Sequence, residues 1–246
     1  MRLLLVNANT TAAITEACTA AARRAAAPGT EIVPATARFG PAVIANRAEN
    51  AIAAHAVLDL LAECAEGCDA VLLAVSFDTG LAAARELLRV PLLGMTEAAC
   101  LFACALGGRF GLISFSSAAM YRELIEGYGL GSRLAGIALI EAAPAAVSAE
   151  PERVAAKVID AARTLAESGA ESAILAGAAF SALWPRLAEG APVPLIDGIA
   201  AGVKLAEALA ALGLAPPSRA APPAPRPSLG LSPALAALLA RTPAGR

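Results

Sequence analysis

The chain has 246 residues, of which 58% are hydrophobic and 16% charged, and its formal net charge is −2 at pH 7. This length suffices for one large α/β domain or two smaller lobes, and the apolar content excludes an intrinsically disordered chain. Acidic and basic residues are interspersed, so the sequence offers no electrostatic footprint for nucleic acid.

The apolar segments are too short for membrane insertion. The longest uncharged runs, 172–185 and 227–240, reach 14 residues, whereas roughly 18–20 are needed to cross a bilayer. The N-terminal apolar run, residues 3–6, is too short for a signal peptide. The odd set of five cysteines fits a reducing compartment better than a disulfide framework. We therefore expect a cytoplasmic protein with no membrane partner.

Apolar runs alternate with helical patterns along most of the chain, which is typical of parallel sheets. The predicted strands cover residues 3–6, 31–34, 70–75, 91–93, 110–114, 137–140, 173–176 and 193–196. The predicted helices cover residues 10–26, 47–66, 81–88, 97–106, 118–128, 151–168, 181–188 and 199–212. A threonine is expected to cap the first helix.

An internal repeat indicates two related halves. Residues 69–99 align with residues 171–201 when one residue is inserted. We expect an α/β protein of two flavodoxin-like lobes, their parallel sheets related by a pseudo-twofold, with a ligand cleft between them. The turns at 75–80 and 177–181 would face each other there, because ligands bind beyond the carboxyl ends of parallel strands.

The repeat also sets the expected domain boundaries. The first lobe comprises residues 1–96 and 198–214, and the second comprises residues 97–197. Residues 215–246 form a Pro/Ala-rich C-terminal arm, in which six prolines between 216 and 227 favour an extended backbone. The last residues can form one short apolar helix, either as a flexible tail or docked on a neighbouring subunit.

Four segments carry a family resemblance: VNANTT (6–11), FDTGLAAARELLRVPLLGMTEAA (77–99), GAESAILAG (169–177) and VPLIDGIAA (193–201). Residues 1 to about 214 resemble the aspartate/glutamate/hydantoin racemase superfamily, and within it the hydantoin racemase branch. The resemblance implies an enzyme that needs no cofactor, binds a small carboxylate or cyclic amide between its lobes, and assembles as a homo-oligomer.

Members of this superfamily use two cysteines, one from each lobe, to exchange the proton on the substrate's chiral carbon. Thiols with a pKa of about 8.5, lowered by nearby helix N-termini, suit both proton transfers near neutral pH. Carried over onto this sequence, the cysteine positions fall on Val75 and Gly177, and a shift of one residue places Ser76 and Ala178 there instead. The resemblance thus implies the family scaffold with both catalytic cysteines replaced.

Asp78 and Ser76 are the candidate catalytic residues of the first turn. Asp78 is the best candidate for a proton acceptor near the expected cleft. Alternatively, its carboxylate caps the following helix, and the backbone N–H bonds of a cap would lower its pKa. Ser76 is a weak base unless a neighbouring group activates it.

Further candidates would bind a ligand through amides, hydroxyls and backbone N–H groups. Such groups at helix N-termini and after strands can hold a carboxylate or an enolate. Turn formation and capping explain those after the first strand equally well. The candidate binding residues are Asn7, Asn9, Thr10, Phe77, Thr79, Ser114, Ser116, Ser117, Gly177, Ala178 and Ala179.

No metal site is expected. Cys64 and Cys68, like Cys100 and Cys104, are spaced four residues apart in predicted helices, but no third ligand follows at a recognisable spacing. These cysteines are better explained as small helix-packing residues. The single histidine, His55, lies mid-helix without a nucleophile motif nearby.

Two functions remain open. The first is a cofactor-independent, isomerase-like or lyase-like enzyme that acts on a small carboxylate or cyclic amide without the usual two-cysteine mechanism. The second is a module that binds a small carboxylate and catalyses nothing.

Overall fold

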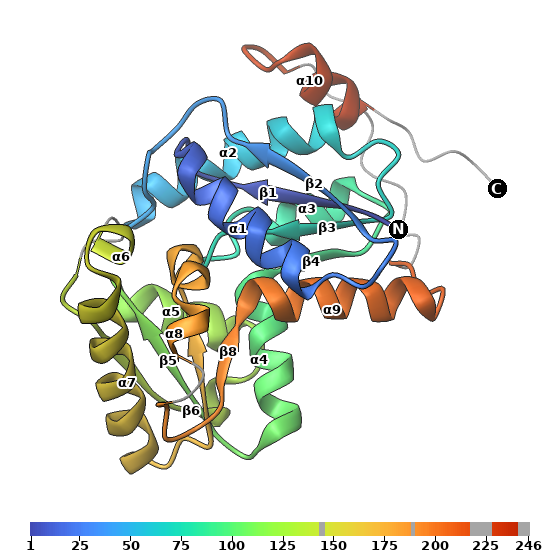
Figure 1. The fold of residues 1–246 in the computed structure, drawn as a ribbon. Helices are drawn as coiled ribbons and strands as arrows, with labels where there is room; N and C mark the ends of the chain where they lie inside the picture. The colour runs from blue at the N-terminus through green and yellow to red at the C-terminus, as the bar shows by residue number, and fades with distance from the viewer. Residues whose placement is uncertain (143–145, 188–189, 217–227, 241–246) are drawn as a thin grey trace.

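Two parallel sheets of four strands, each flanked by helices, make up the fold (Figure 1). The computed structural model describes residues 1–142, 146–187, 190–216 and 228–240. The first sheet has the strand order β2-β1-β3-β4 and the second has the order β6-β5-β7-β8. The strands are β1 (Arg2–Asn7), β2 (Glu31–Thr36), β3 (Ala70–Leu73), β4 (Leu92–Gly94), β5 (Phe110–Ser114), β6 (Leu134–Leu139), β7 (Ser172–Leu175) and β8 (Leu195–Asp197). The predicted two-sheet α/β class is confirmed.

Helices alternate with the strands along the chain. The longer ones are α1 (Ala12–Ala25), α2 (Arg47–Cys64), α3 (Leu81–Leu87), α4 (Met95–Leu106), α5 (Ala118–Gly127), α7 (Pro151–Glu167), α9 (Gly198–Ala211) and α10 (Pro233–Ala240). Short helical segments are η1 (Gly131–Arg133), α6 (Ala146–Ala149), η2 (Ala178–Ala182) and α8 (Trp184–Leu187).

Helices cover both faces of the sheets. Successive side chains of a strand point to opposite faces, so both sets of side chains are buried. In β1, Leu4 and Val6 pack with α2 on one face, while Leu3 and Leu5 pack with α1 and α9 on the other. All four side chains are fully buried. An uninterrupted apolar run is therefore the expected sequence of this central strand.

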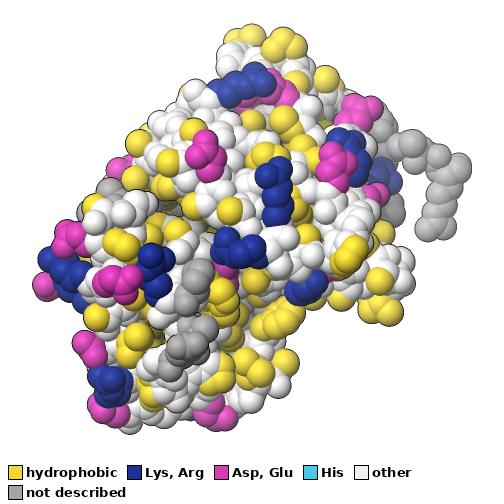
Figure 2. Space-filling view, viewed as in Figure 1, with side chains coloured by type: hydrophobic (Ala, Val, Ile, Leu, Met, Phe, Trp, Pro, Cys, Tyr) yellow, Lys and Arg dark blue, Asp and Glu magenta, His cyan; other side chains and the backbone are white. Residues whose placement is uncertain are grey.

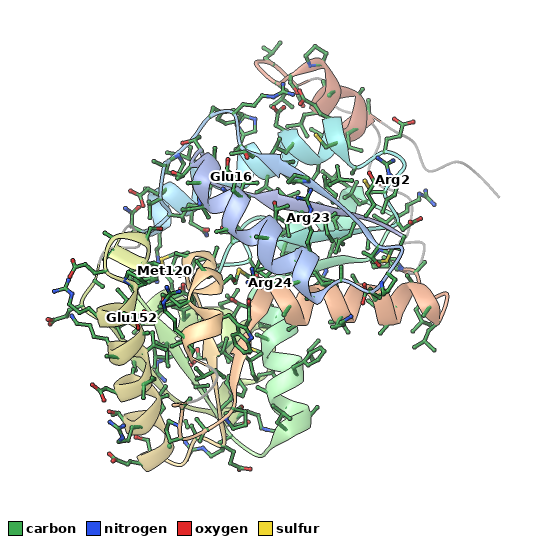
Figure 3. The ribbon with its side chains drawn as sticks, in the orientation of Figure 1. Arg2, Glu16, Arg23, Arg24, Met120 and Glu152 are labelled. Atoms are coloured by element: carbon green, nitrogen blue, oxygen red, sulfur yellow. The ribbon has the colours of Figure 1, made fainter. Side chains whose placement is uncertain are left out.

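Helix α9 connects the two halves of the molecule. It begins directly after β8 of the second sheet and then packs on α1 and β3 of the first half, as well as on α4 (Figure 1). Arg24 of α1 points toward the second half, and its guanidinium donates to the Ser181 carbonyl over 3.0 Å (Figure 3). The predicted lobe boundaries and twofold relation stay predictions.

One helix prediction holds only in part, and another is wrong. Thr11 is at the N-cap of α1 but makes no capping hydrogen bond, because its hydroxyl donates to the Ala42 carbonyl instead. The helix predicted over residues 181–188 is divided into η2 and α8. Pro185 has no N–H to donate to the Ser181 carbonyl, so a helix that began at residue 181 would lack this bond, whereas Pro185 is tolerated in the first turn of α8.

Helix α10 is the last helix among the described residues, and it packs on α2 of the same chain (Figure 1). Leu235 and Leu238 of α10 are only 2% and 8% exposed. A flexible tail is therefore wrong for residues 233–240. Most of the proline run, residues 217–227, lies outside the described residues.

Within the described part of the chain, every helix is too short or too polar to span a bilayer. On the face shown in Figure 2, acidic and basic side chains are interspersed, as in the sequence.

Candidate functional site

A small cavity lies where strands of both sheets end. Its volume is about 70 Å³, well below the roughly 300–1,000 Å³ of pockets for drug-sized ligands, so it suits a compact ligand. The wall comes mainly from the turns after β1, β3, β5 and β7, at the carboxyl ends of parallel strands, where such folds bind ligands. The lining residues are Asn9, Ile14, Val43, Ile44, Ala74, Val75, Ser76, Phe77, Ser114, Phe115, Ser116, Tyr121, Ala176, Gly177, Ala178 and Ala179.

Most of the candidate site residues come together in this wall. They are Asn9, Ser76, Phe77, Ser114, Ser116, Gly177, Ala178 and Ala179. That these residues bind or act on a ligand stays a prediction. The candidates outside the wall are Asn7, Thr10, Asp78, Thr79 and Ser117.

Three of these outlying candidates shape the turns around the cavity. The Thr79 hydroxyl donates to the Asn50 side chain of α2 over 2.6 Å. The Thr10 backbone N–H donates to the Pro41 carbonyl. Ser117 is the N-cap of α5, with a left-handed φ of 54°. Each of these residues therefore has a structural partner or position of its own.

Asn7 is fully buried and holds Asn9 in place. Its Nδ2 donates to Asn9 Oδ1 over 3.1 Å and to Thr15 Oγ1 over 3.0 Å. The backbone N–H of Thr11 also donates to Asn9 Oδ1, which fixes the orientation of the Asn9 amide. Among the described residues, the Asn9 NH₂ group has no acceptor, so it can donate to a ligand in the cavity.

The candidate base Asp78 is directed away from the cavity. Its carboxylate accepts hydrogen bonds from the backbone N–H groups of Thr96 and Glu97 at the start of α4, and from the Tyr128 hydroxyl over 2.6 Å. The alternative of a helix cap is thus realised, although on α4 rather than on the next helix, α3. Burial raises the pKa of Asp78 to about 7, against the opposing effect of these hydrogen bonds. Gly94 permits the approach, since a Cβ there would lie 2.2 Å from the carboxylate.

Ser76 and Tyr121 are hydrogen-bonded neighbours in the cavity wall. The two hydroxyl oxygens are 2.7 Å apart, and Tyr121 also donates to the Ala176 carbonyl over 3.1 Å. Tyr121 stacks on Phe77, with ring centroids 4.5 Å apart. Burial raises the pKa of Tyr121 to about 12. The phenol is therefore neutral near pH 7.

Comparison with known proteins places this architecture in a family. The model of the Asp/Glu/hydantoin racemase family matches residues 3–206. The chain belongs to this family. A hydantoin racemase of Rhizobium meliloti is 33% identical over 221 residues, which cover 87% of this chain and 91% of that protein.

Solved structures of racemases share the fold. Allantoin racemase from Klebsiella pneumoniae has 34% sequence identity and a TM-score of 0.83, with 89% of this chain and 95% of that chain covered. Allantoin racemase from Pseudomonas fluorescens has 31% identity and the same TM-score, with 89% and 99% covered.

Val75 and Gly177 both line the cavity, Val75 in the turn after β3 and Gly177 in the turn after β7. That they replace the family's two cysteines stays a prediction. Gly177 is closely covered by an aromatic pair, Phe115 and Phe180, whose rings stack with centroids 4.2 Å apart. A Cβ at position 177 would lie 3.0 Å from the Phe180 ring and 3.3 Å from the Phe115 ring. A side chain at this position therefore requires one of these rings to move.

No cysteine of the described chain lines the cavity. Cys18 of α1 contacts a wall residue without lining the cavity itself. Its Sγ is 3.9 Å from the Ala178 carbonyl oxygen. Burial raises the pKa of Cys18 to about 12, with a smaller contribution from Asp197. Burial likewise raises the pKa of Cys100. Such thiols stay protonated and inert at neutral pH.

Several wall residues were not among the sequence candidates: Ile14, Val43, Ile44, Phe115 and Tyr121. Tyr121 lies on the buried side of α5, and in the sequence its position is that of an ordinary core residue. The one sequence signal for its role was the hydroxyl group, because the hydroxyl of a buried tyrosine usually forms a hydrogen bond with a partner. Val43 and Ile44 lie in the segment before α2, which has no periodic pattern.

Proposed function

We propose that this chain is a cofactor-independent enzyme of the isomerase or lyase type, which acts on a carbon next to the carbonyl of a small cyclic amide or carboxylate, without a catalytic thiol. The observation that carries the proposal is a family cavity lined by hydrogen-bond donors that have no partners. Among the described residues, Asn9 Nδ2 and the backbone N–H groups of Gly177, Ala178 and Ala179 donate to no acceptor.

Unpaired donors suit the chemistry of a carbon acid. When the carbon next to a carbonyl loses its proton, negative charge develops on the carbonyl oxygen. Donors held in place before the reaction stabilise this enolate more than they stabilise the neutral substrate, which lowers the barrier. Among the described residues that line the cavity, none carries a carboxylate, an imidazole or an amine. Water or a group of the substrate itself therefore moves the proton.

The names of the relatives favour the cyclic amide. Proteins at 31–34% identity are named as hydantoin or allantoin racemases. A compact ring of this kind suits the small cavity, and its carbonyl groups match the unpaired donors of the wall.

The alternative, a module that binds a small carboxylate without acting on it, has one observation in its favour. Among the described residues of the wall, Tyr121 alone is titratable, and its raised pKa makes it a poor base at neutral pH. The same unpaired donors that stabilise an enolate would hold a carboxylate.

Proton exchange separates the two functions. The purified protein is incubated in deuterated water with hydantoins, amino acids and malonates, and α-deuteration and CO₂ release are measured. We expect exchange or decarboxylation well above the buffer rate, reduced at least tenfold in Asn9→Ala. Ser168→Ala, on the far end of α7, is the control and should leave the rate unchanged. No exchange, together with a carboxylate that raises the melting temperature, would favour the binding module.

A further inference from the structure

A chain of hydrogen bonds joins the two halves of the molecule at the cavity. Ser76 follows β3 of the first sheet, Tyr121 lies in α5, and Ala176 follows β7 of the second sheet. The Ser76 and Tyr121 hydroxyl oxygens are 2.7 Å apart, and Tyr121 donates to the Ala176 carbonyl over 3.1 Å. These hydrogen bonds therefore link the turn after a strand of the first sheet to the turn after a strand of the second.

The direction of these bonds follows from counting protons. A carbonyl oxygen can only accept, so the single Tyr121 O–H is used toward Ala176. Either hydroxyl could donate in the contact between Ser76 and Tyr121, but the two bonds of Tyr121 form together only when Ser76 is the donor to Tyr121. The remaining lone pairs of Ser76 Oγ are left at the cavity wall. Ser76 is thereby an acceptor toward anything bound there, although a free serine can donate as well.

The surrounding contacts hold this arrangement in place. Tyr121 is 1% exposed and stacks on Phe77. The Ser114 hydroxyl donates to the same Ala176 carbonyl over 2.8 Å. At the Ser76 end of these hydrogen bonds, the Thr96 hydroxyl donates to the Ser76 backbone carbonyl over 2.7 Å. If Tyr121 donated to Ser76 instead, its bond to the Ala176 carbonyl would be lost, so the arrangement with Ser76 as the donor makes one more hydrogen bond.

We infer that Tyr121 is a positioning residue. It accepts the hydrogen bond of the Ser76 hydroxyl proton, so that Ser76 Oγ accepts a hydrogen bond from an N–H group of the bound ligand. This inference rests on the proposed function, since it takes the cavity to be the ligand site. A cyclic amide has a ring N–H to offer, whereas a carboxylate has no donor and meets the Ser76 lone pairs. Because Ser76 and Tyr121 come from different halves, the acceptor is set only when both halves are in contact.

Binding of matched probes tests the role of Tyr121. The probes are hydantoin, its N1-methyl and N3-methyl derivatives, and malonate, and their affinities are measured by calorimetry. We expect wild type to prefer hydantoin over one of its N-methyl derivatives by about tenfold, the value of one hydrogen bond. Tyr121→Phe and Ser76→Ala should each abolish this preference, and the double variant should lose nothing more.

Malonate gives the opposite sign, which a merely structural role for Tyr121 cannot do. In Tyr121→Phe the Ser76 hydroxyl is free to donate, so malonate affinity should rise while hydantoin affinity falls. The matched control is Tyr128→Phe, which removes the hydroxyl bonded to Asp78 outside the cavity and should keep the wild-type preference.

Three results would overturn the inference. These are an N-methyl preference that persists in Ser76→Ala, equal weakening of both ligands in Tyr121→Phe, and no hydantoin binding by wild type. In the last case the proposed function on a cyclic amide fails as well. If hydantoin binds with the expected pattern but its α-proton does not exchange, only the proposed function fails.

Discussion

The Tyr128 hydroxyl donates to the Asp78 carboxylate over 2.6 Å, which links the turn after β3 to the end of α5. Asp78 is buried, with a left-handed φ of 46° that turns its side chain toward the start of α4. Two backbone N–H groups of α4 complete its hydrogen bonding. The carboxylate of Asp78 thus serves the contact between the two halves.

This burial makes stability depend on pH. The pKa of Asp78 is raised to about 7 in the folded protein, compared with about 3.9 in an unfolded chain. The folded state therefore binds the proton more tightly, and the stabilisation from this protonation is complete below about pH 4 and lost as the pH rises to about 7. Asp78→Asn should remove this contribution to the slope of unfolding free energy against pH. Denaturant unfolding between pH 4.5 and 8 measures it, and parallel curves for both proteins would contradict the assignment.

Gly177→Ala should destabilise the protein by about 1–3 kcal/mol, because a methyl group pressed into a packed site forces its neighbours to move. The added Cβ would lie 3.0 Å from the Phe180 ring. Adding Phe180→Leu to Gly177→Ala should restore part of the lost unfolding free energy, because the smaller side chain leaves space for the added methyl group. Gly127→Ala is the control, since its Cβ meets nothing within 4 Å. Equal unfolding free energies for Gly177→Ala and Gly127→Ala would show that the Phe115 and Phe180 rings move aside without a cost in stability.

Parts of this site could be predicted from the sequence and others could not. Ser76, Ser114 and Gly177 follow buried apolar strands, and parallel strands end together at one edge, so their meeting follows from local pattern. The direction of the Asp78 side chain depends on one backbone angle and on α4, which begins 17 residues later. Tyr121 lies in an apolar helical pattern typical of core residues, and its hydroxyl finds Ser76 only after both sheets are assembled.

Asn7 at the end of β1 and Asn9 in the turn after it should have different roles, Asn7 in stability and Asn9 in ligand binding. Asn7→Ala removes hydrogen bonds to Asn9 and Thr15 from a fully buried site, so it should cost about 1–3 kcal/mol of unfolding free energy. Asn9→Ala should change stability less but weaken ligand binding, because its NH₂ group is unpaired at the cavity. Unfolding and calorimetry on both variants test this. A ligand affinity unaffected by Asn9→Ala would remove Asn9 from the site.

Helix α10 should stabilise the chain without affecting the cavity. Leu235→Ala, at a side chain 2% exposed against α2, should lower the unfolding free energy by about 1–3 kcal/mol, since burying one leucine contributes this much. Leu239→Ala, at a side chain 43% exposed, is the control and should change little. Ligand affinity should be the same in both variants, because α10 does not line the cavity. A loss of affinity in Leu235→Ala would indicate that α10 contributes to the site.

Reaction without a thiol is tested most directly by a variant in which Cys18, Cys64, Cys68, Cys100 and Cys104 are all replaced by alanine. Its rate of α-deuterium exchange into the preferred substrate is measured per folded molecule, with the folded fraction taken from thermal unfolding. We expect a rate within about twofold of wild type, because none of these side chains lines the cavity. A fall to the buffer rate in a folded variant would show that a cysteine carries the proton.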